Sequence, residues 1–338
     1  MQTDKIAVIE LSTKAVKWLI PIVDNETIES TPFNFKHFNK ESKNTETGNG
    51  LNSQGILSER YFVSRVLPYI KKAYSSVMKA NVDVVYCVAT AVYRSARNIN
   101  NILQIIKQET GLEVCILTEE EEAEYTFWAY FYSTTHQEEL LQKPYTLLID
   151  QGGGSTEITF FHKQKIVFRK SFDMGTTILK NDFFSQSHEL TIDRFTYIDN
   201  KYQQIIRNDL EGLGIENVHV SNEEIYCVCV GTAVTAAFGD GSKPNKAIHE
   251  KTLDLTQIDN IIEKRNKEFC TISPLAIQEQ IENDSGKSYT FGKRFSSRLG
   301  LPVISEILQF FNIQSVRISG TGLWYGVFYA NFYDLQIQ

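Results

Sequence analysis

The chain has 338 residues, a formal net charge of −7 and 42% apolar residues. This length exceeds the usual size of one domain, so we expect two domains with separate hydrophobic cores. The acidic balance argues against a general nucleic-acid surface, because binding to phosphate backbones depends on an excess of Lys and Arg. The sequence shows no 18-residue apolar stretch and no signal-like beginning, so we expect a cytoplasmic protein without membrane contact.

The cysteine pattern gives no sign of a metal site. The five cysteines lie mostly in apolar, strand-like runs without C-x-x-C spacing, which predicts reduced, buried thiols. Cys227 and Cys229 would point the same way on a strand, but two cysteines without further ligands make a poor metal site. The five are Cys87, Cys115, Cys227, Cys229 and Cys270.

In the first part of the chain, alternating apolar runs from Lys5 to Ile20 predict a hairpin with its turn at Glu10 to Lys14. The polar stretch from residue 24 to 54 predicts a long surface loop or an irregular strand. Ser58 is a candidate N-cap for a helix in which Pro68 introduces a kink. The elements expected next are a strand at 82–88, a helix at 101–108, a strand at 114–117 and a helix at 119–132.

A polar break at 133–143 is the predicted domain boundary. It divides an N-terminal domain, 1–135, from a C-terminal domain, 136–321, and a last helix at about 322–338 is expected to pack back on the first domain. The second domain is expected to hold strands at 165–172, 226–230 and 316–319, and helices starting near 176 and spanning 193–209, 233–238, 255–268, 274–282 and 303–311. Strands and helices alternate in both halves, which predicts an α/β fold with mixed sheets.

The most informative stretch is YTLLIDQGGGSTEITFF, from Tyr145 to Phe161, which predicts two buried strands joined by a tight turn. The three glycines lack Cβ atoms, so their backbone can adopt positive φ and bring N–H groups against an anion. Asp150 and Glu157 place carboxylates at the rim, where a bound phosphate would require a bridging cation such as magnesium. The alternative is an ordinary hairpin turn.

This stretch resembles the second phosphate loop of the exopolyphosphatase and guanosine pentaphosphate phosphatase family, within the superfamily of actin, sugar kinases and heat-shock chaperone ATPases. The resemblance implies two duplicated ribonuclease H-like (actin-like ATPase) domains with a cleft between them. Further similar segments follow in family order: the opening strand, GNGLNSQGILSER, VATAVYRSARN, LTEEEEAEY, FDMGTT, CVGTAVTAAF and VRISGTGLWYGVF.

The resemblance also implies two catalytic residues. Glu122 aligns with the family's carboxylate that orients the attacking water, and Arg94 aligns with its phosphate-binding arginine, whose guanidinium suits bidentate contact. From the residues alone, Glu119 to Glu122 could equally be a solvated first turn favoured by the helix dipole, and Arg94 an ordinary surface arginine.

The remaining expected site residues come from three loops and three carboxylates. The phosphate-binding set is Gly152, Gly153, Gly154, Ser155, Thr156, Gly231, Thr232, Ser12, Thr13 and Lys14. The set expected to hold Mg²⁺, or another divalent cation, is Asp150, Glu157 and Glu10.

Two loops depart from the family pattern. Members begin with Asp-Leu-Gly-Ser-Asn-Ser, whereas this chain has Glu10-Leu11-Ser12-Thr13-Lys14-Ala15. The C-terminal Ser-Asp-Gly turn has become Ser319-Gly320-Thr321, and the Arg-Glu pair that follows is Trp324-Tyr325.

The resemblance therefore implies a phosphatase that hydrolyses a phosphoanhydride bond, in polyphosphate ends or a guanosine penta- or tetraphosphate. The alternatives are a regulator that binds such a ligand with little or no catalysis and, with less support, an ATP-dependent kinase. The expected partners are the polyphosphate or nucleotide ligand and a second copy of the chain in a homodimer, without nucleic acid.

Overall fold

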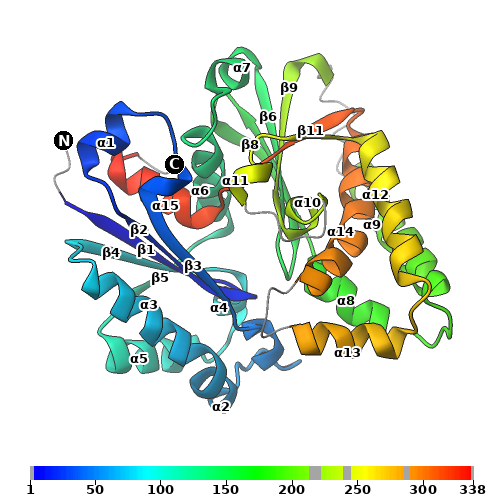
Figure 1. The fold of residues 1–338 in the computed structure, drawn as a ribbon, viewed down its shortest axis with the longest axis horizontal. Helices are drawn as coiled ribbons and strands as arrows, with labels where there is room; N and C mark the ends of the chain where they lie inside the picture. Colours follow the sequence, from blue (N-terminus) through cyan, green and yellow to red (C-terminus); the bar gives the residue numbers. More distant parts are fainter. Residues whose placement is uncertain (1–3, 213–221, 239–244, 285–289, 336–338) are drawn as a thin grey trace. The chain divides into compact units, whose positions relative to one another are not determined.

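The computed structural model describes residues 4–212, 222–238, 245–284 and 290–335. These divide into two compact units, residues 1–137 with 321–338, and residues 138–320 (Figure 1). No helix in the described part of the chain is long and apolar enough to cross a membrane.

Unit 1 is built on a five-stranded mixed sheet with the order β3-β2-β1-β4-β5. Strand β1 pairs antiparallel with β2 and parallel with β4, so the predicted hairpin is confirmed. Its turn is shorter than expected, because Glu10 and Leu11 still belong to β1. The strands are β1 (Ile6–Leu11), β2 (Ala15–Pro21), β3 (Phe38–Asn44), β4 (Val84–Ala89) and β5 (Val114–Ile116).

Helices cover both faces of this sheet. One face packs against α3 (Leu67–Lys79) and α5 (Ile99–Thr110), with Trp18 and Phe62 fully buried between them. The other face packs against α6 (Glu119–Phe131) and α15 (Leu323–Phe332) through apolar residues such as Leu19 and Phe328. Helices α6 and α15 cross closely, because a Cβ at Gly326 would lie 1.6 Å from the Tyr125 carbonyl oxygen.

Short helices complete unit 1. Ser58 caps the helix that follows it, as expected, and a π-helical turn precedes Pro68 at the start of α3. The segments are α1 (Asn25–Ser30), η1 (Phe35–His37), η2 (Thr47–Gly50), α2 (Glu59–Tyr61), η3 (Phe62–Val66) and α4 (Ala91–Ser95).

Unit 2 contains a six-stranded mixed sheet with the order β10-β11-β9-β6-β7-β8. Strands β6, β9 and β11 run parallel, while β6, β7 and β8 form an antiparallel meander. The strands are β6 (Tyr145–Gln151), β7 (Thr156–His162), β8 (Lys165–Phe172), β9 (Ile225–Gly231), β10 (Thr252–Asp254) and β11 (Ser315–Ile318).

Long helices pack on the sheet of unit 2 and bury a core rich in phenylalanine (Figure 1). Helix α14 is the centre of this packing, since it contacts α8, α9, α10, α12 and α13. The helices are α7 (Gln137–Gln142), α8 (Thr176–Ser185), α9 (Thr191–Gly212), α10 (Thr232–Thr235), α11 (Asn245–Ile248), α12 (Leu255–Phe269), α13 (Pro274–Asp284) and α14 (Thr290–Phe310).

Two expectations about helix bounds were wrong, and two other segments need more detail. In the polar stretch 24–54, expected to be a surface loop or an irregular strand, β3 is a regular strand that pairs with β2 over seven residues and buries only one apolar side chain. The polar break 133–143, the predicted domain boundary, contains the short helix α7. Helix α14 starts thirteen residues before the predicted 303 and runs through Pro302, whereas α10 ends after one turn.

The cysteine prediction holds only in part. Cys87, Cys227 and Cys229 are buried, and burial raises the pKa of the Cys87 thiol to about 12. Cys115 and Cys270 are exposed: Cys115 lies in β5, an edge strand of its sheet, and Cys270 is the C-cap of α12. All five are free thiols, so none supports a disulfide.

Candidate active site

Three loops of unit 2 meet at one edge of its sheet. Because β6, β9 and β11 are parallel, their carboxyl ends lie side by side, with Gln151 paired to Gly231 and Ile318 to Cys229. The glycine turn follows β6, the Gly231-Thr232 turn follows β9, and Ser319-Gly320 follows β11. Ligands of open α/β sheets bind at such carboxyl edges, so this edge is the candidate phosphate site of unit 2.

The glycine turn is fixed by contact with the start of α8. The N–H groups of Thr176 and Thr177 donate to the carbonyls of Gly152 and Gly153, at 3.0 and 2.8 Å. A Cβ at Gly175 would lie 2.3 Å from the Gly153 carbonyl, so only glycine allows this approach. The expectation of positive φ was wrong: Gly152, Gly153 and Gly154, which the structure describes, all avoid that region. Close packing of backbone on backbone requires glycine at position 175 instead, whereas a Cβ at Gly152 would meet only the Ser155 carbonyl oxygen, at 3.6 Å.

The turn presents three consecutive donors. Gly152 N–H is used within the turn, since it donates to the Ser155 carbonyl at 3.0 Å. The N–H groups of Gly153, Gly154 and Ser155 donate to no acceptor among the residues that the structure describes. All three residues are partly exposed, so an anion could accept from these amides.

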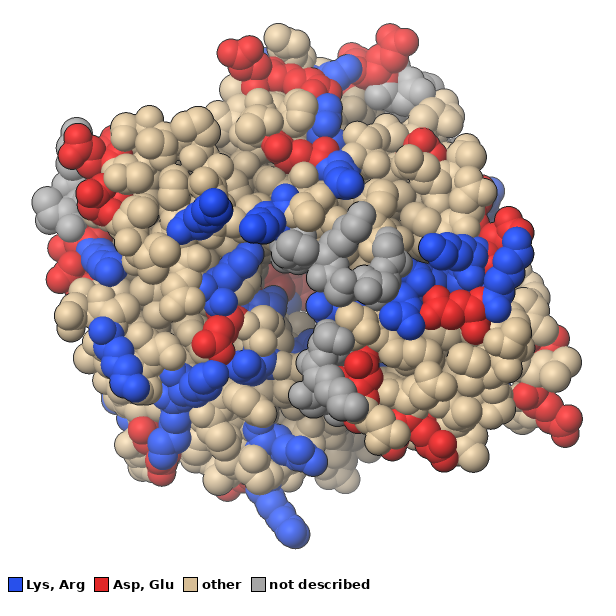
Figure 2. Space-filling model, in the orientation of Figure 1, with Lys and Arg blue, Asp and Glu red and all other residues tan. Residues whose placement is uncertain are grey.

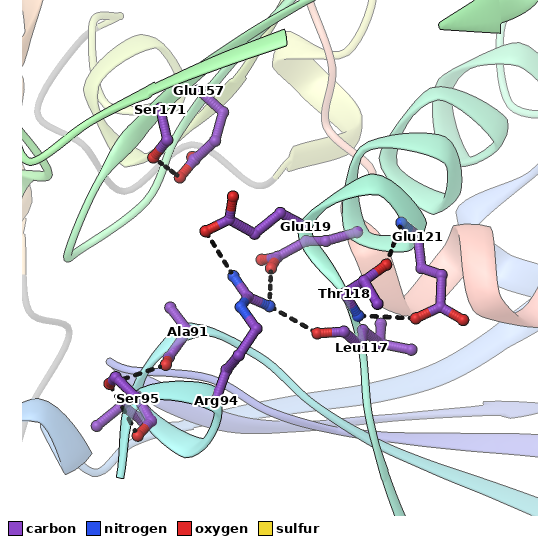
Figure 3. Close-up of polar contacts among 11 residues, drawn as sticks. Ala91, Arg94, Ser95, Leu117, Thr118, Glu119, Glu121, Glu157 and Ser171 are labelled. Atoms are coloured by element: carbon purple, nitrogen blue, oxygen red, sulfur yellow. Dashed lines mark hydrogen bonds and ion pairs between the residues drawn. The ribbon is translucent and has the colours of Figure 1, made fainter.

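Asp150 and Glu157 lie next to this turn on paired strands. They are directly opposite each other in the antiparallel β6–β7 ladder, which puts both side chains on the same face of the sheet. The Ser171 hydroxyl donates to Glu157 Oε1 at 3.0 Å and orients that carboxylate (Figure 3). Two carboxylates fit Mg²⁺, which commonly takes one or two protein carboxylates and completes its shell with water and phosphate oxygens. The described residues contain no group of three or more His, Cys, Asp or Glu placed to hold a metal.

Other residues of this edge have structural contacts. Thr156 is fully buried and donates to the Met174 carbonyl at 3.0 Å, so its hydroxyl anchors the turn and does not face a ligand. Gly231 has φ of 121°, and a Cβ there would lie 2.2 Å from the Gln151 carbonyl oxygen. Glycine is therefore required where β9 passes the end of β6, and Thr232 begins the single turn of α10.

His249 is a residue of this edge that the sequence analysis did not identify. Its Nδ1 accepts a hydrogen bond from the Gly320 N–H at 2.9 Å, which ties the segment before β10 to the loop after β11. An isolated histidine in the segment Ala-Ile-His-Glu has no motif, and only the antiparallel pairing of β10 with β11 brings it to this edge.

Unit 1 brings Arg94 and Glu122 together, and Figure 3 shows Arg94 pointing toward Glu119 at the start of α6. Arg94 lies in the last turn of the short helix α4. Its Nη1 donates to Glu122 Oε2 at 3.2 Å and to the Leu117 carbonyl at 2.7 Å. Glu119 Oε1 lies 3.6 Å from Nη2. Each of these three side chains keeps between 27% and 42% of its surface exposed, so the group is accessible to a ligand.

The four acids that begin α6 have different positions. Glu121 forms a capping box with Thr118, each side chain accepting from the other's backbone N–H. Glu119 and Glu122 face Arg94, and Glu120 is exposed. The four acids therefore differ in role: one caps the helix, two contact Arg94 and one is exposed to solvent. All four are also favoured by the positive end of the helix dipole.

The turn between β1 and β2 is held by hydrogen bonds within the turn and to the segment that follows β3. The Ser12 hydroxyl accepts from the Ala15 N–H, while the carbonyls of Thr13 and Lys14 accept from N–H groups of residues 45–48. Glu10 is 2% exposed; its Oε1 accepts from Lys17 Nζ at 2.6 Å, and its Oε2 has no hydrogen-bond partner among the described residues. That buried oxygen suits a cation, but any metal would share the carboxylate with Lys17.

Comparison with known proteins indicates one family for most of the chain. The model of the Ppx/GppA phosphatase family matches residues 26–333. A bifunctional 3-dehydroquinate synthase/phosphatase from Fusobacterium nucleatum is 26% identical over 180 residues, which are 53% of this chain and 26% of that protein. The chain thus matches about a quarter of the length of this curated relative.

Solved structures share the fold. A Ppx/GppA family member from Aquifex aeolicus is similar with a TM-score of 0.69 and 20% identity, covering 98% of both chains. An exopolyphosphatase from Cytophaga hutchinsonii gives a TM-score of 0.73 and 19% identity, covering 98% of this chain and 99% of the other. Both units thus have the mixed-sheet α/β architecture expected of the actin-like ATPase fold, and the match over residues 26–333 shows that this chain belongs to the Ppx/GppA phosphatase family.

Proposed function

We propose that the protein is a phosphatase that hydrolyses a phosphoanhydride bond, at the end of polyphosphate or in a guanosine penta- or tetraphosphate. The observation that carries this proposal is the row of three amides at Gly153, Gly154 and Ser155 without acceptors in the described part of the chain. Phosphoryl transfer is catalysed mainly by positioning and by donors aimed at the phosphoryl oxygens, and these amides are donors of that kind.

Each residue group has a distinct task in this proposal. The amides of the glycine turn donate hydrogen bonds to non-bridging phosphate oxygens, and the planar guanidinium of Arg94 can bind a phosphate through two hydrogen bonds. Glu122 orients water and takes its proton. Contact with Arg94 keeps the Glu122 carboxylate positioned before substrate arrives. That the loops of both units act on one substrate stays a prediction of the resemblance.

Asp150 and Glu157 would hold a divalent cation, proposed to be Mg²⁺. When bound, the cation would neutralise charge on the phosphate oxygens. The two carboxylates set its position, and Ser171 restricts the rotation of Glu157. Glu10 remains a third proposed ligand, with Lys17 as its competitor. Among the proposed phosphate donors, Thr13, Lys14, Gly231 and Thr232 would act through backbone N–H groups or, for Lys14, the ammonium. The Ser12 N–H donates to the Ala15 carbonyl at 2.9 Å within the turn, so Ser12 would have to release this bond to bind phosphate.

The second candidate is a regulator that binds the same ligands and turns them over slowly or not at all. The internal hydrogen bond of Ser12 favours this candidate, because the hydroxyl is engaged where family members have a glycine. Homodimer assembly and a cytoplasmic location remain further proposals.

Phosphate release measured with Mg²⁺ tests the main proposal. The panel should hold polyphosphates of several lengths, guanosine pentaphosphate, guanosine tetraphosphate and ATP, each also assayed with excess chelator. Metal-dependent release from a guanosine polyphosphate or polyphosphate, with ATP much slower, is expected. Tight binding of these ligands without release would favour the regulator, and neither binding nor release would contradict both candidates.

A further inference from the structure

Lys40 has an unusual setting for a surface-strand lysine. It lies in β3 opposite Leu19 of β2, on the sheet face that packs against α15. Its Nζ sits 4.2 Å from the centroid of the Phe35 ring and 5.4 Å from that of Tyr325. Phe33 and Phe38 extend this aromatic wall, because both contact the Tyr325 ring edge-on. Lys40 is therefore held mainly by rings, whose faces attract an ammonium but replace only part of the hydration that burial removes.

Charged neighbours do not compensate for this loss of water. The next residue, Glu41, turns to the opposite face of the sheet and binds Lys72 of α3 at 2.8 Å. On the Lys40 face, β2 contributes Lys17, whose ammonium is bound to Glu10. From α15, burial raises the pKa of Tyr325, so its phenol stays neutral. Within the described residues no carboxylate forms an ion pair with Lys40.

This setting favours the neutral amine. Burial is the cause that lowers the pKa of Lys40 to about 8. At pH 7.5 such an amine is about a quarter neutral, whereas an ordinary lysine amine is neutral in about one molecule per thousand. A desolvated lysine amine of this kind is a nucleophile near neutral pH. The side chain also keeps partial exposure, so a small reagent can reach it.

We propose that Lys40 is a site of acylation by small acyl phosphates. The neutral amine attacks the carbonyl carbon, a C–N bond forms, the C–O bond to phosphate breaks, inorganic phosphate leaves, and the amine's extra proton passes to solvent. Lys and Arg side chains gather on the surface over β3 (Figure 2), and their field attracts the anionic acyl phosphate to this face. The product is a neutral amide, which also removes the cation from the aromatic wall.

Acetyl phosphate is the probe, and Lys36 is the matched control. Lys36 lies in η1, four residues before Lys40, and is exposed, whereas Lys40 is only partly exposed, so accessibility by itself would make Lys36 react faster. The whole folded protein is treated with the reagent, and acetylation of both lysines is quantified by mass spectrometry from the same reaction. Because both lysines meet the same reagent concentration, its hydrolysis does not affect the ratio of their rates. Lys40 is expected to be acetylated at least about tenfold faster than Lys36 at pH 7.5, since its larger neutral fraction exceeds the loss of nucleophilicity that accompanies lower basicity. Its rate should reach half-maximum near pH 8.

A variant separates the aromatic wall from simple accessibility. Phe35→Ala removes the nearer ring and admits water, so acetylation of Lys40 at pH 7.5 should slow toward the Lys36 rate even though the amine becomes more exposed. Circular dichroism and the unchanged Lys36 rate would verify that the variant is folded. Acetylation of Lys40 no faster than that of Lys36 in the native protein would overturn the proposal, as would a Phe35→Ala variant in which Lys40 reacts equally fast or faster.

Discussion

Arg94 donates to Glu122 across 3.2 Å, so the only pair of side chains to which the family resemblance assigns catalysis is in direct contact in the described structure. The two residues are 28 positions apart and come from separate helices, α4 and α6. The contact holds the carboxylate beside a cation that can also bind phosphate.

Glu122→Gln should lower turnover by about 10²-fold or more while leaving ligand affinity nearly unchanged, because the amide keeps the size of the side chain but cannot accept a proton. Steady-state phosphate release and equilibrium binding measure the two effects. Glu120→Gln is the control, since it removes one charge from the same helix turn at an exposed position. Equal effects of the two substitutions would contradict the assignment of Glu122.

Arg94→Ala should weaken polyphosphate binding and flatten its dependence on salt, because a cation that contacts the ligand is lost. Affinity is measured by titration at several ionic strengths. Lys79→Ala removes one positive charge at an exposed position at the end of α3 and should have little effect. If the two variants have the same affinity at low salt, Arg94 does not contact the ligand.

Asp150→Asn and Glu157→Gln should each raise the Mg²⁺ concentration that gives half-maximal activity, with little change in thermal stability without metal. The reason is that each substitution removes a charged oxygen from the proposed cation site. Ser171→Ala should have a smaller effect in the same direction, because it removes only the hydrogen bond that orients Glu157. Unchanged Mg²⁺ dependence in both carboxylate variants would exclude this pair as ligands.

Gly175→Ala should damage the glycine turn, since the new Cβ would lie 2.3 Å from Gly153 backbone atoms. The expected result is weaker phosphate binding together with lower stability. Gly212→Ala serves as the control: it also adds one methyl group, but it has no neighbour within 4 Å and lies at the end of a helix. Normal ligand binding by a folded Gly175→Ala protein would show that the turn is not the phosphate site.

Arg298→Met should destabilise the protein by about 3 kcal/mol, because it leaves the half-buried Asp199 carboxylate without its partner. Arg298 is 1% exposed and makes two hydrogen bonds to Asp199, at 3.0 and 2.7 Å, while its guanidinium lies 4.2 Å from the Phe195 ring centroid. Urea unfolding measures the change. In the Asp199→Asn background the same substitution should cost less, and an equal cost would show that packing on Phe195 dominates.

The sequence by itself determined the fold class and the identity of the glycine turn. Apolar alternation marked β1, β2, β6 and β7, and Asp150, three glycines and Glu157 stand within eight consecutive residues, so local pattern was sufficient. Local pattern also placed the N-cap at Ser58 and the start of α6.

The tertiary structure alone decided what depends on packing between distant segments. Strand β3 is polar, so only its pairing with β2 makes it a strand. Glycine at 175 and 231 is required by backbone from elsewhere in the chain, not by local turn geometry. The same holds for the Arg94–Glu122 contact, the His249 bond to Gly320 and the aromatic wall at Lys40. Sequence periodicity reports which face of an element is apolar, but it carries no information on which distant residue that face will meet.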